Sequence, residues 1–338
     1  MMKKYYQSFM ALLLAMLLLT ACGQTPQAAP EASQPASTEE VATQVTESVL
    51  VDICAETLLQ SVSKPVFGPV GGEWAAIGLA RWGGEVPQEW FDNYYAAVES
   101  HVKDCGGILH ERKYTEYSRV ILALTAIGKN PEIVGGYNLL APLADFEQTT
   151  FQGVNGPVFT LLALDSGNYE IPANTTGSTQ ATRELYVDYI LSMESPEGGW
   201  SLTGGEADVD ITAMVLQALS NYQDRQDVCD AAERALNYLS NVQNEDGGFT
   251  AFDNDSSESV SQMIVALTQW GISIEDPRFV KNGNTLQDRL LDFMTQDYRF
   301  RHTLDADADL MATEQAFLAL TALHRAEQGK PAIYNMAQ

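Results

Sequence analysis

The sequence predicts an all-α fold, an (α/α)6 toroid in which six helical hairpins form an inner and an outer ring of helices. Three observations lead to this prediction. A short apolar pattern that ends in Ala-Leu or a variant recurs six times, at intervals of about 40 to 55 residues, the length of one helical hairpin. Amphipathic segments alternate with these repeats, and paired glycines separate some of them.

The repeated segments are the predicted inner helices. They are apolar on nearly every side, which indicates that protein covers all their faces. They span residues 73–83, 116–128, 155–167, 208–222, 258–271 and 311–324.

The segments between them are predicted to form the outer ring, because they are apolar on one side only. Residues 228–243 illustrate the pattern. One helical face would carry Val228, Ala232, Ala235, Leu236, Leu239 and Val242, and the other Asp230, Glu233, Arg234, Asn237 and Asn241. Six such alternations can close into a toroid, which hides the terminal faces that an open stack of hairpins would have to cap.

The hinges between the two rings share a local signal. Residues 195–200 (SPEGGW) and 244–249 (NEDGGF) place two glycines after an outer helix, where a positive φ ends it, followed by an aromatic residue that can pack back. The aromatic residues Trp200, Phe249 and Phe300 precede the leucines at 219, 267 and 320 by nearly equal spacings. We therefore expect them to occupy one structural position.

The two ends of the chain differ in composition from the repeats. Two lysines precede a short apolar run, and the Leu-Thr-Ala-Cys sequence that ends at Cys22 resembles the lipobox of bacterial lipoproteins. We expect a signal peptide at 1–21 and lipidation of Cys22, which would anchor the protein at the outer side of the cell membrane. A secreted protein with a chance cysteine is the alternative. Residues 22–48 are expected to be a solvated tether, 49–328 the toroid and 329–338 a C-terminal tail.

Charge and cysteine content exclude several functions. With 45 acidic and 19 basic residues, the chain has a net charge of -26, which disfavours the binding of nucleic acid, anionic membrane surfaces and diphosphates. A need for solubility alone would also explain this charge. Cys54, Cys105 and Cys229 allow at most one disulfide, with Cys54–Cys105 and buried free thiols as the open alternatives. No zinc-binding spacing occurs, so we expect neither a metal nor a cofactor. We also expect the protein to be a monomer.

Several stretches resemble the terpenoid cyclase and protein prenyltransferase superfamily of α/α toroids. The segment ALNYLSNVQNEDGGF is similar to the QW repeat of squalene-type cyclases, with Gln243, Gly247 and Phe249 at its marked positions. The stretches GGEWAAIGLARWG and NGPVFTLLALDSGNYE look like secreted or surface prenyltransferase-repeat proteins of Gram-positive bacteria. Cobalamin carriers of the intrinsic factor type share the toroid more distantly. The resemblance covers about residues 65–328 and implies the fold more strongly than an activity.

The same resemblance argues against the superfamily's two best-known activities. Residues 208–214 resemble the DxDD motif by which class II cyclases protonate an alkene, with Asp208 first and Asp210 in the middle. In the motif the last aspartate supports the acid, but in this sequence Ile211 stands in its place. In prenyltransferases an Asp, a Cys and a His hold zinc, but the corresponding loop after Phe249 lacks a cysteine.

Acidic side chains recur near the predicted N-terminal ends of the inner helices. Asp208, Asp210, Glu258 and Glu314 lie at comparable levels, where a cap or first-turn position explains them fully. The functional alternative is that they line one mouth of the central cavity, together with Trp200, Phe249, His302, Arg119, Gln262 and Gln315. The fragments 253–255 and 305–309 resemble the start of a calcium loop but lack its glycine and closing glutamate.

Three functions remain open. We favour the non-catalytic binding of a hydrophobic or amphipathic small molecule, isoprenoid- or cobalamin-like, in the central cavity. The second is an enzyme, either cyclase-like or a hydrolase with two carboxylates, for which Asp210 and Asp208 are the candidates. The third is a structural or protein-binding scaffold, which predicts a lumen filled by side chains.

Overall fold

The computed structural model describes residues 47–251 and 254–337, which belong to one compact unit. The predicted signal peptide, Cys22 and nearly all of the predicted tether lie outside these residues. The described chain contains twelve α-helices and a single two-stranded ribbon, β1 (Thr250–Ala251) with β2 (Asn254–Asp255). The predicted all-α fold is thus confirmed, with α1 beginning at Glu47, two residues before the expected start of the domain.

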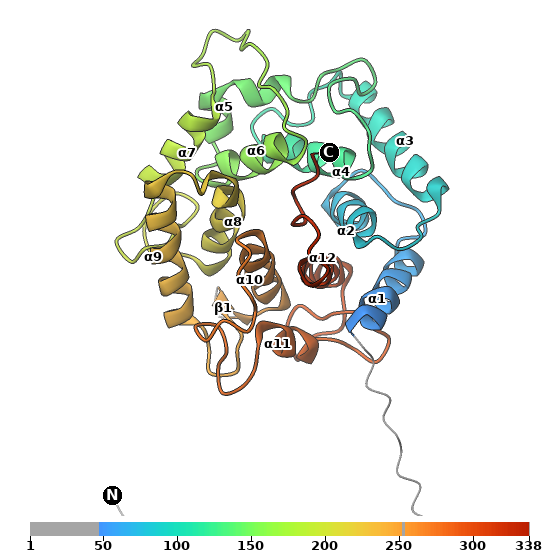
Figure 1. Ribbon diagram of the computed structural model, residues 1–338. Helices are drawn as coiled ribbons and strands as arrows, with labels where there is room; N and C mark the ends of the chain where they lie inside the picture. The colour runs from blue at the N-terminus through green and yellow to red at the C-terminus, as the bar shows by residue number, and fades with distance from the viewer. Residues whose placement is uncertain (1–46, 252–253, 338) are drawn as a thin grey trace, which may run out of the picture. The chain divides into compact units, whose positions relative to one another are not determined.

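The helices alternate between two rings, as predicted. The inner ring consists of α2 (Trp74–Trp82), α4 (Thr115–Ala126), α6 (Asn155–Ser166), α8 (Val209–Leu219), α10 (Ser257–Gln269) and α12 (Leu310–Glu327). The outer ring consists of α1 (Glu47–Ser61), α3 (Gln88–Asp104), α5 (Phe146–Thr150), α7 (Arg183–Ser192), α9 (Gln226–Val242) and α11 (Leu286–Asp292). Each inner helix contacts the next, and α12 contacts α2, so the ring is closed (Figure 1).

Burial follows the predicted difference between the two rings. In α12 the residues from Ala312 to Arg325 are all buried, whereas α9 buries one face only. One residue departs from the prediction, since Val242, expected on the buried face of α9, is 39% exposed. It is the last residue of the helix, where the chain turns inward. The third outer element departs more, because α5 has five residues and follows a 3₁₀ turn at Ala141–Ala144.

The hinge residues have the predicted equivalence. Trp200, Phe249 and Phe300 are fully buried. The backbone carbonyls of Trp200 and Phe300 each accept a hydrogen bond from the amide of the aspartate that caps the following helix, Asp208 or Asp309. Two residues before these aromatics the backbone has φ of 90° at Gly198, 89° at Gly247 and 60° at Tyr298. The last hinge therefore adopts the left-handed conformation without a glycine.

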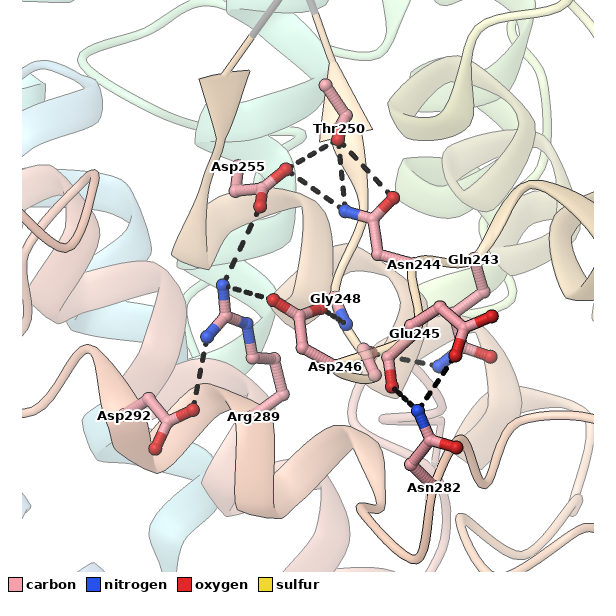
Figure 2. A network of polar contacts seen from close by, with 11 residues as sticks. Gln243, Asn244, Glu245, Asp246, Gly248, Thr250, Asp255, Asn282, Arg289 and Asp292 are labelled. Atoms are coloured by element: carbon pink, nitrogen blue, oxygen red, sulfur yellow. Dashed lines mark hydrogen bonds and ion pairs between the residues drawn. The ribbon is translucent and has the colours of Figure 1, made fainter. Parts of the chain in front are cut away.

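The hinge after α9 shows how polar side chains fix the turn (Figure 2). Gln243 donates from Nε2 to the carbonyls of Gly247 and Phe279, at 2.9 and 3.1 Å. Arg289, from α11, lies 2.9 Å from Asp246 and 3.7 Å from Asp255, with its side chain 6% exposed. The guanidinium supplies positive charge to this acidic loop, and Asp255 of the calcium-like fragment 253–255 faces it. Asp253 lies outside the described residues.

The C-terminal tail closes one end of the ring, which the sequence did not predict. Arg81, at the end of α2, donates to the carbonyls of Ile333, Ala332 and Asn335 at 2.9 to 3.0 Å. The amide of Met336 donates to the carbonyl of Ser166, the last residue of α6. The tail thus crosses the ring at the C-terminal ends of the inner helices (Figure 1). The other end, at the helix N-termini, is called the mouth below.

The three cysteines of the described chain are free thiols. Cys54 is buried in α1, and burial raises the pKa of its thiol to about 12. Cys105 lies at the C-terminal cap of α3 and Cys229 on α9. Of the two alternatives left by the sequence, the structure therefore has free thiols rather than a Cys54–Cys105 disulfide.

Candidate functional site

The mouth is built from helix caps, as the sequence suggested. Asp208 caps α8 by accepting from the amide of Ile211 at 2.9 Å, and Asp309 caps α12 through Ala312 at the same distance. Ser256 has this role in α10. Asp210 and Glu258 each occupy the first turn of their helix, where the dipole favours a carboxylate.

A cluster of acidic groups gathers where α8 meets α10. Glu258 pairs with His302, whose Nδ1 lies 2.8 Å from the Glu258 carboxylate. Burial, reinforced by the charges of Asp208 and Glu258, raises the pKa of Asp210 to about 6, against the lowering effects of Ser259 and His302. The Oδ1 of Asp210 is buried and has no hydrogen-bond partner in the described chain. Asp210 therefore retains an unused acceptor beside the mouth.

A second polar cluster joins the first and last inner helices. Glu73 has no exposed surface, and its Oε2 lies 2.9 Å from Arg119 Nε on α4. Arg119 also pairs with Glu116. Glu314 Oε1 accepts from the amide of Gly71 at 2.8 Å, while its Oε2 is buried without a partner in the described chain. Burial, together with the charge of Glu73, raises the pKa of Glu314 to about 8. Arg119 thus joins α2 to α4, and Glu314 holds the seam between α12 and α2.

Three glutamines form a chain of amides along α8, α10 and α12. Gln217 Nε2 donates to the side-chain oxygen of Gln262 at 2.8 Å and to its carbonyl at 3.0 Å. Gln262 Nε2 donates in turn to Gln315 Oε1 at 3.0 Å. The structure thus brings together two of the predicted mouth residues, Gln262 and Gln315, and adds Gln217.

Two aromatic residues face each other from α2 and α6. The rings of Trp74 and Phe159 are 6.3 Å apart and tilted by 53°, and both side chains are partly buried. Because α4 separates α2 from α6 in the ring, these side chains meet on the inner side of α4. The aromatic candidates from the sequence, Trp200 and Phe249, are instead fully buried, and Trp200 Nε1 donates to the carbonyl of Ile190 at 2.7 Å. Their burial makes them packing residues with no surface for a ligand.

Below the mouth the ring is filled by side chains. Leu162, Val265 and Leu318 continue the faces of Phe159, Gln262 and Gln315 by one helical turn, and each is at most 3% exposed. A groove of about 550 Å³ lies at the opposite end, lined among others by Ile272, Leu323 and Lys330, and contains none of the predicted site residues. Buried side chains at this level are what the scaffold alternative predicts, and a ligand of the favoured kind would have to occupy the mouth rather than a deep lumen.

Two further properties of the described residues bear on function. No group of three or more His, Cys, Asp or Glu among them could hold a metal ion. Within the same residues, no helix is both long and apolar enough to cross a membrane.

Sequence reasoning missed Glu73, Trp74, Phe159 and Gln217. The repeat pattern includes Glu73 and Trp74 without marking them, although a glutamate directly after two glycines at a helix start was a usable signal. Gln217 is a polar residue in the middle of an otherwise apolar inner helix, which also could have marked it.

Comparisons with known proteins agree with this geometry. The family model for the squalene-hopene cyclase C-terminal domain matches residues 205–296, which include α8, α9, α10 and α11. The chain has the α/α-toroid fold of the terpenoid cyclases. No curated protein matches the toroid at the level of sequence.

The toroid is also similar to solved structures of enzymes. An unsaturated glucuronyl hydrolase from Bacillus sp. GL1 matches with a TM-score of 0.54 and 12% identity, over 85% of this chain and 98% of that chain. A wild-type glycosidase matches with a TM-score of 0.51 and 11% identity, over 81% and 96%. An ent-copalyl diphosphate synthase from Streptomyces platensis matches with a TM-score of 0.49 and 18% identity, over 74% and 49%.

Proposed function

We propose that this toroid is an extracytoplasmic, lipid-anchored protein that binds a small amphipathic molecule at its mouth without catalysis. The observation that supports this most is the composition of the mouth. Partly buried apolar side chains such as Trp74, Phe159 and Met214 lie toward the N-terminal ends of their helices, as do Gln262, Gln315 and the unpaired acceptor of Asp210. An apolar surface with a few convergent polar groups is typical of a small-molecule site.

The two ends of the ring support a binding function differently. The tail occupies the C-terminal end, where Ile333 and Tyr334 are buried. At the mouth Met311, in the first turn of α12, is 47% exposed, and His302 has a side chain that is 50% exposed. The tail therefore lies away from the mouth, where side chains at the rim are open to solvent.

The test is a binding screen on the purified protein by native mass spectrometry, with farnesol and cyanocobalamin as the first probes and neutral and amino oligosaccharides as the next. Binding that Phe159→Ser weakens, and that Ile133→Ser does not, would support the mouth as the site. Ile133 is 69% exposed and lies after α4, at the opposite end. Failure of all these probes to bind would contradict the proposal.

The anchor requires a separate experiment. Metabolic labelling with a radioactive fatty acid should mark the wild-type protein and not a Cys22→Ser variant. Equal labelling of both would refute the lipid anchor.

A hydrolase is the second candidate function. It is favoured by Asp210, a carboxyl group whose pKa of about 6 lets it carry a proton near neutral pH, beside the carboxylate of Glu258. The glucuronyl hydrolase that shares the fold is named for the degradation of glycosaminoglycan. Turnover of an unsaturated glucuronyl disaccharide or of neutral disaccharides, abolished by Asp210→Asn, would replace the binding proposal. Turnover that Asp210→Asn leaves unchanged would exclude Asp210 as the acid.

A further inference from the structure

The geometry points to a neutral or amino saccharide as the ligand of the mouth. This inference rests on the proposed binding function and names its ligand class. It comes from the way in which the inner ring divides into two chemically different halves, which the order of the helices places opposite each other.

The half formed by α2, α4 and α6 presents aromatic surface. Trp74 and Phe159 meet on the inner side of α4 with ring centroids 6.3 Å apart, and both side chains keep part of their surface accessible. The negative face of such a ring attracts weakly positive C–H groups. It therefore suits the C–H face of a sugar ring as well as a hydrocarbon.

The half formed by α8, α10 and α12 presents amides. The chain runs from Gln217, which is buried near the end of α8, to Gln262 and then to Gln315, with each Nε2 donating to the next side-chain oxygen at 2.8 and 3.0 Å. The Nε2 of Gln315 donates to no other group of the described chain, so its hydrogens are available at the end of the series. Gln262 is partly exposed and Gln315 is 8% exposed. This wall offers donors and acceptors side by side, which is the pattern that vicinal hydroxyl groups match.

The two halves together discriminate between ligand classes. An isoprenoid would fit the aromatic wall but would cover the amides without offering them a hydrogen-bond partner, which is unfavourable. A sugar ring has one apolar face and a hydroxyl edge, and satisfies both walls at once.

The charge of the mouth selects among sugars. Asp210 and Glu258 lie beside the amide wall, and the chain has a net charge of -26, so a uronic acid would be repelled. A hydroxyl or an ammonium group can instead donate to the carboxylate of Glu258, whose side chain is 19% exposed, whereas the unpaired Oδ1 of Asp210 is buried behind it. Neutral and amino sugars therefore fit, and uronic acids do not.

The experiment compares four probes on the purified wild-type protein by isothermal titration calorimetry. The probes are cellobiose, chitosan trisaccharide, a glucuronic acid disaccharide and farnesol. We expect the first two to bind at least about tenfold more tightly than the uronic acid. Saturation-transfer NMR, with irradiation of aromatic protons, should mark the C–H face of the bound sugar and needs no variant.

Matched variants locate the site. Gln262→Leu and Trp74→Leu should each weaken saccharide binding by about tenfold or more, because each removes one of the two walls. Gln223→Leu is the control for the amide, since Gln223 is exposed after α8 at the opposite end and donates only to the carbonyl of Ser220. Thermal unfolding of each variant shows whether it is folded. If a variant is not folded, the NMR experiment on the wild type tests the inference instead.

Each outcome discriminates. Saccharide binding that both mouth variants weaken supports the inference. Farnesol binding at the mouth without saccharide binding overturns the inference and leaves the proposed binding function. Tighter binding of the uronic acid also overturns it, and binding of no probe overturns both proposals.

Discussion

Replacing Glu314 by glutamine should make the protein more stable at alkaline pH. Glu314 is 1% exposed, accepts one bond from the amide of Gly71 and leaves its second oxygen without a partner in the described chain. Its pKa rises from an ordinary 4.5 to about 8, because burial and the neighbouring Glu73 disfavour the charged form. The side-chain amide introduced by Glu314→Gln would be uncharged at every pH and could keep the bond to Gly71.

The direction and size follow from proton linkage. Below pH 4.5 Glu314 is protonated in the folded and the unfolded chain, and contributes nothing to the pH dependence. As the pH rises the unfolded chain loses this proton first, so the free energy of unfolding falls until the pH passes 8. The difference between 4.5 and about 8 corresponds to an upper limit of roughly 5 kcal/mol, at about 1.36 kcal/mol per pKa unit.

Urea unfolding followed by circular dichroism at pH 5, 7 and 9 measures this effect. The variant should differ little from the wild type at pH 5 and should be more stable by a few kcal/mol at pH 9. Glu327→Gln is the control, because Glu327 is exposed at the end of the same helix, and its pH profile should parallel that of the wild type. Parallel profiles for Glu314→Gln and the wild type would refute the reasoning.

Three further substitutions test the packing of the mouth and hinges. Arg119→Met should lower the free energy of unfolding at pH 7 by about 3–5 kcal/mol, because it leaves the fully buried Glu73 without its ion pair; a loss below about 1 kcal/mol in urea would contradict this. In the wild type the free energy of unfolding should fall by up to roughly 3 kcal/mol as the pH rises from 3.8 to 6, and Asp210→Asn should remove this fall. If urea unfolding gave the variant the same pH profile as the wild type, Asp210 would not be desolvated. Tyr298→Gly should raise the melting temperature by a few degrees, because relieving a φ of 60° gains about 1 kcal/mol; a lower melting temperature would contradict this.

The fold could be predicted because each repeat carries its own local signals. A turn with positive φ, an aromatic residue and a helix cap follow one another within about a dozen residues, and each has a local physical cause. Trp200 and Phe300 show this equivalence in detail, since their amides donate to the same kind of partner, a threonine hydroxyl oxygen at the start of the next helix, at 2.9 and 3.0 Å. Tyr298 shows that the structural position persists even where the glycine signal is missing.

The site could be predicted only where its contacts are local. Asp208 caps its own helix three residues later, and the sequence suggested this directly. The bonds from Arg119 to Glu73 and from Gly71 to Glu314 join residues 46 and 243 positions apart; the first depends on the packing of neighbouring hairpins and the second on the closure of the ring. The opposition of aromatic and amide walls has the same origin, because periodicity identifies an inner helix but not which of its residues faces the axis.

The aspartates of residues 208–210 now have distinct roles, and these argue against cyclase chemistry independently of Ile211. Protonating an alkene requires a carboxyl group that is a much stronger acid than usual. Asp210 stands where that acid would be, but burial and the charges of Asp208 and Glu258 raise its pKa to about 6, which makes it a weaker acid. Asp208 is engaged as a helix cap and adds negative charge instead of withdrawing it. The raised pKa of Asp210 therefore weighs against its use as the acid of a cyclase, whichever residue stands at position 211.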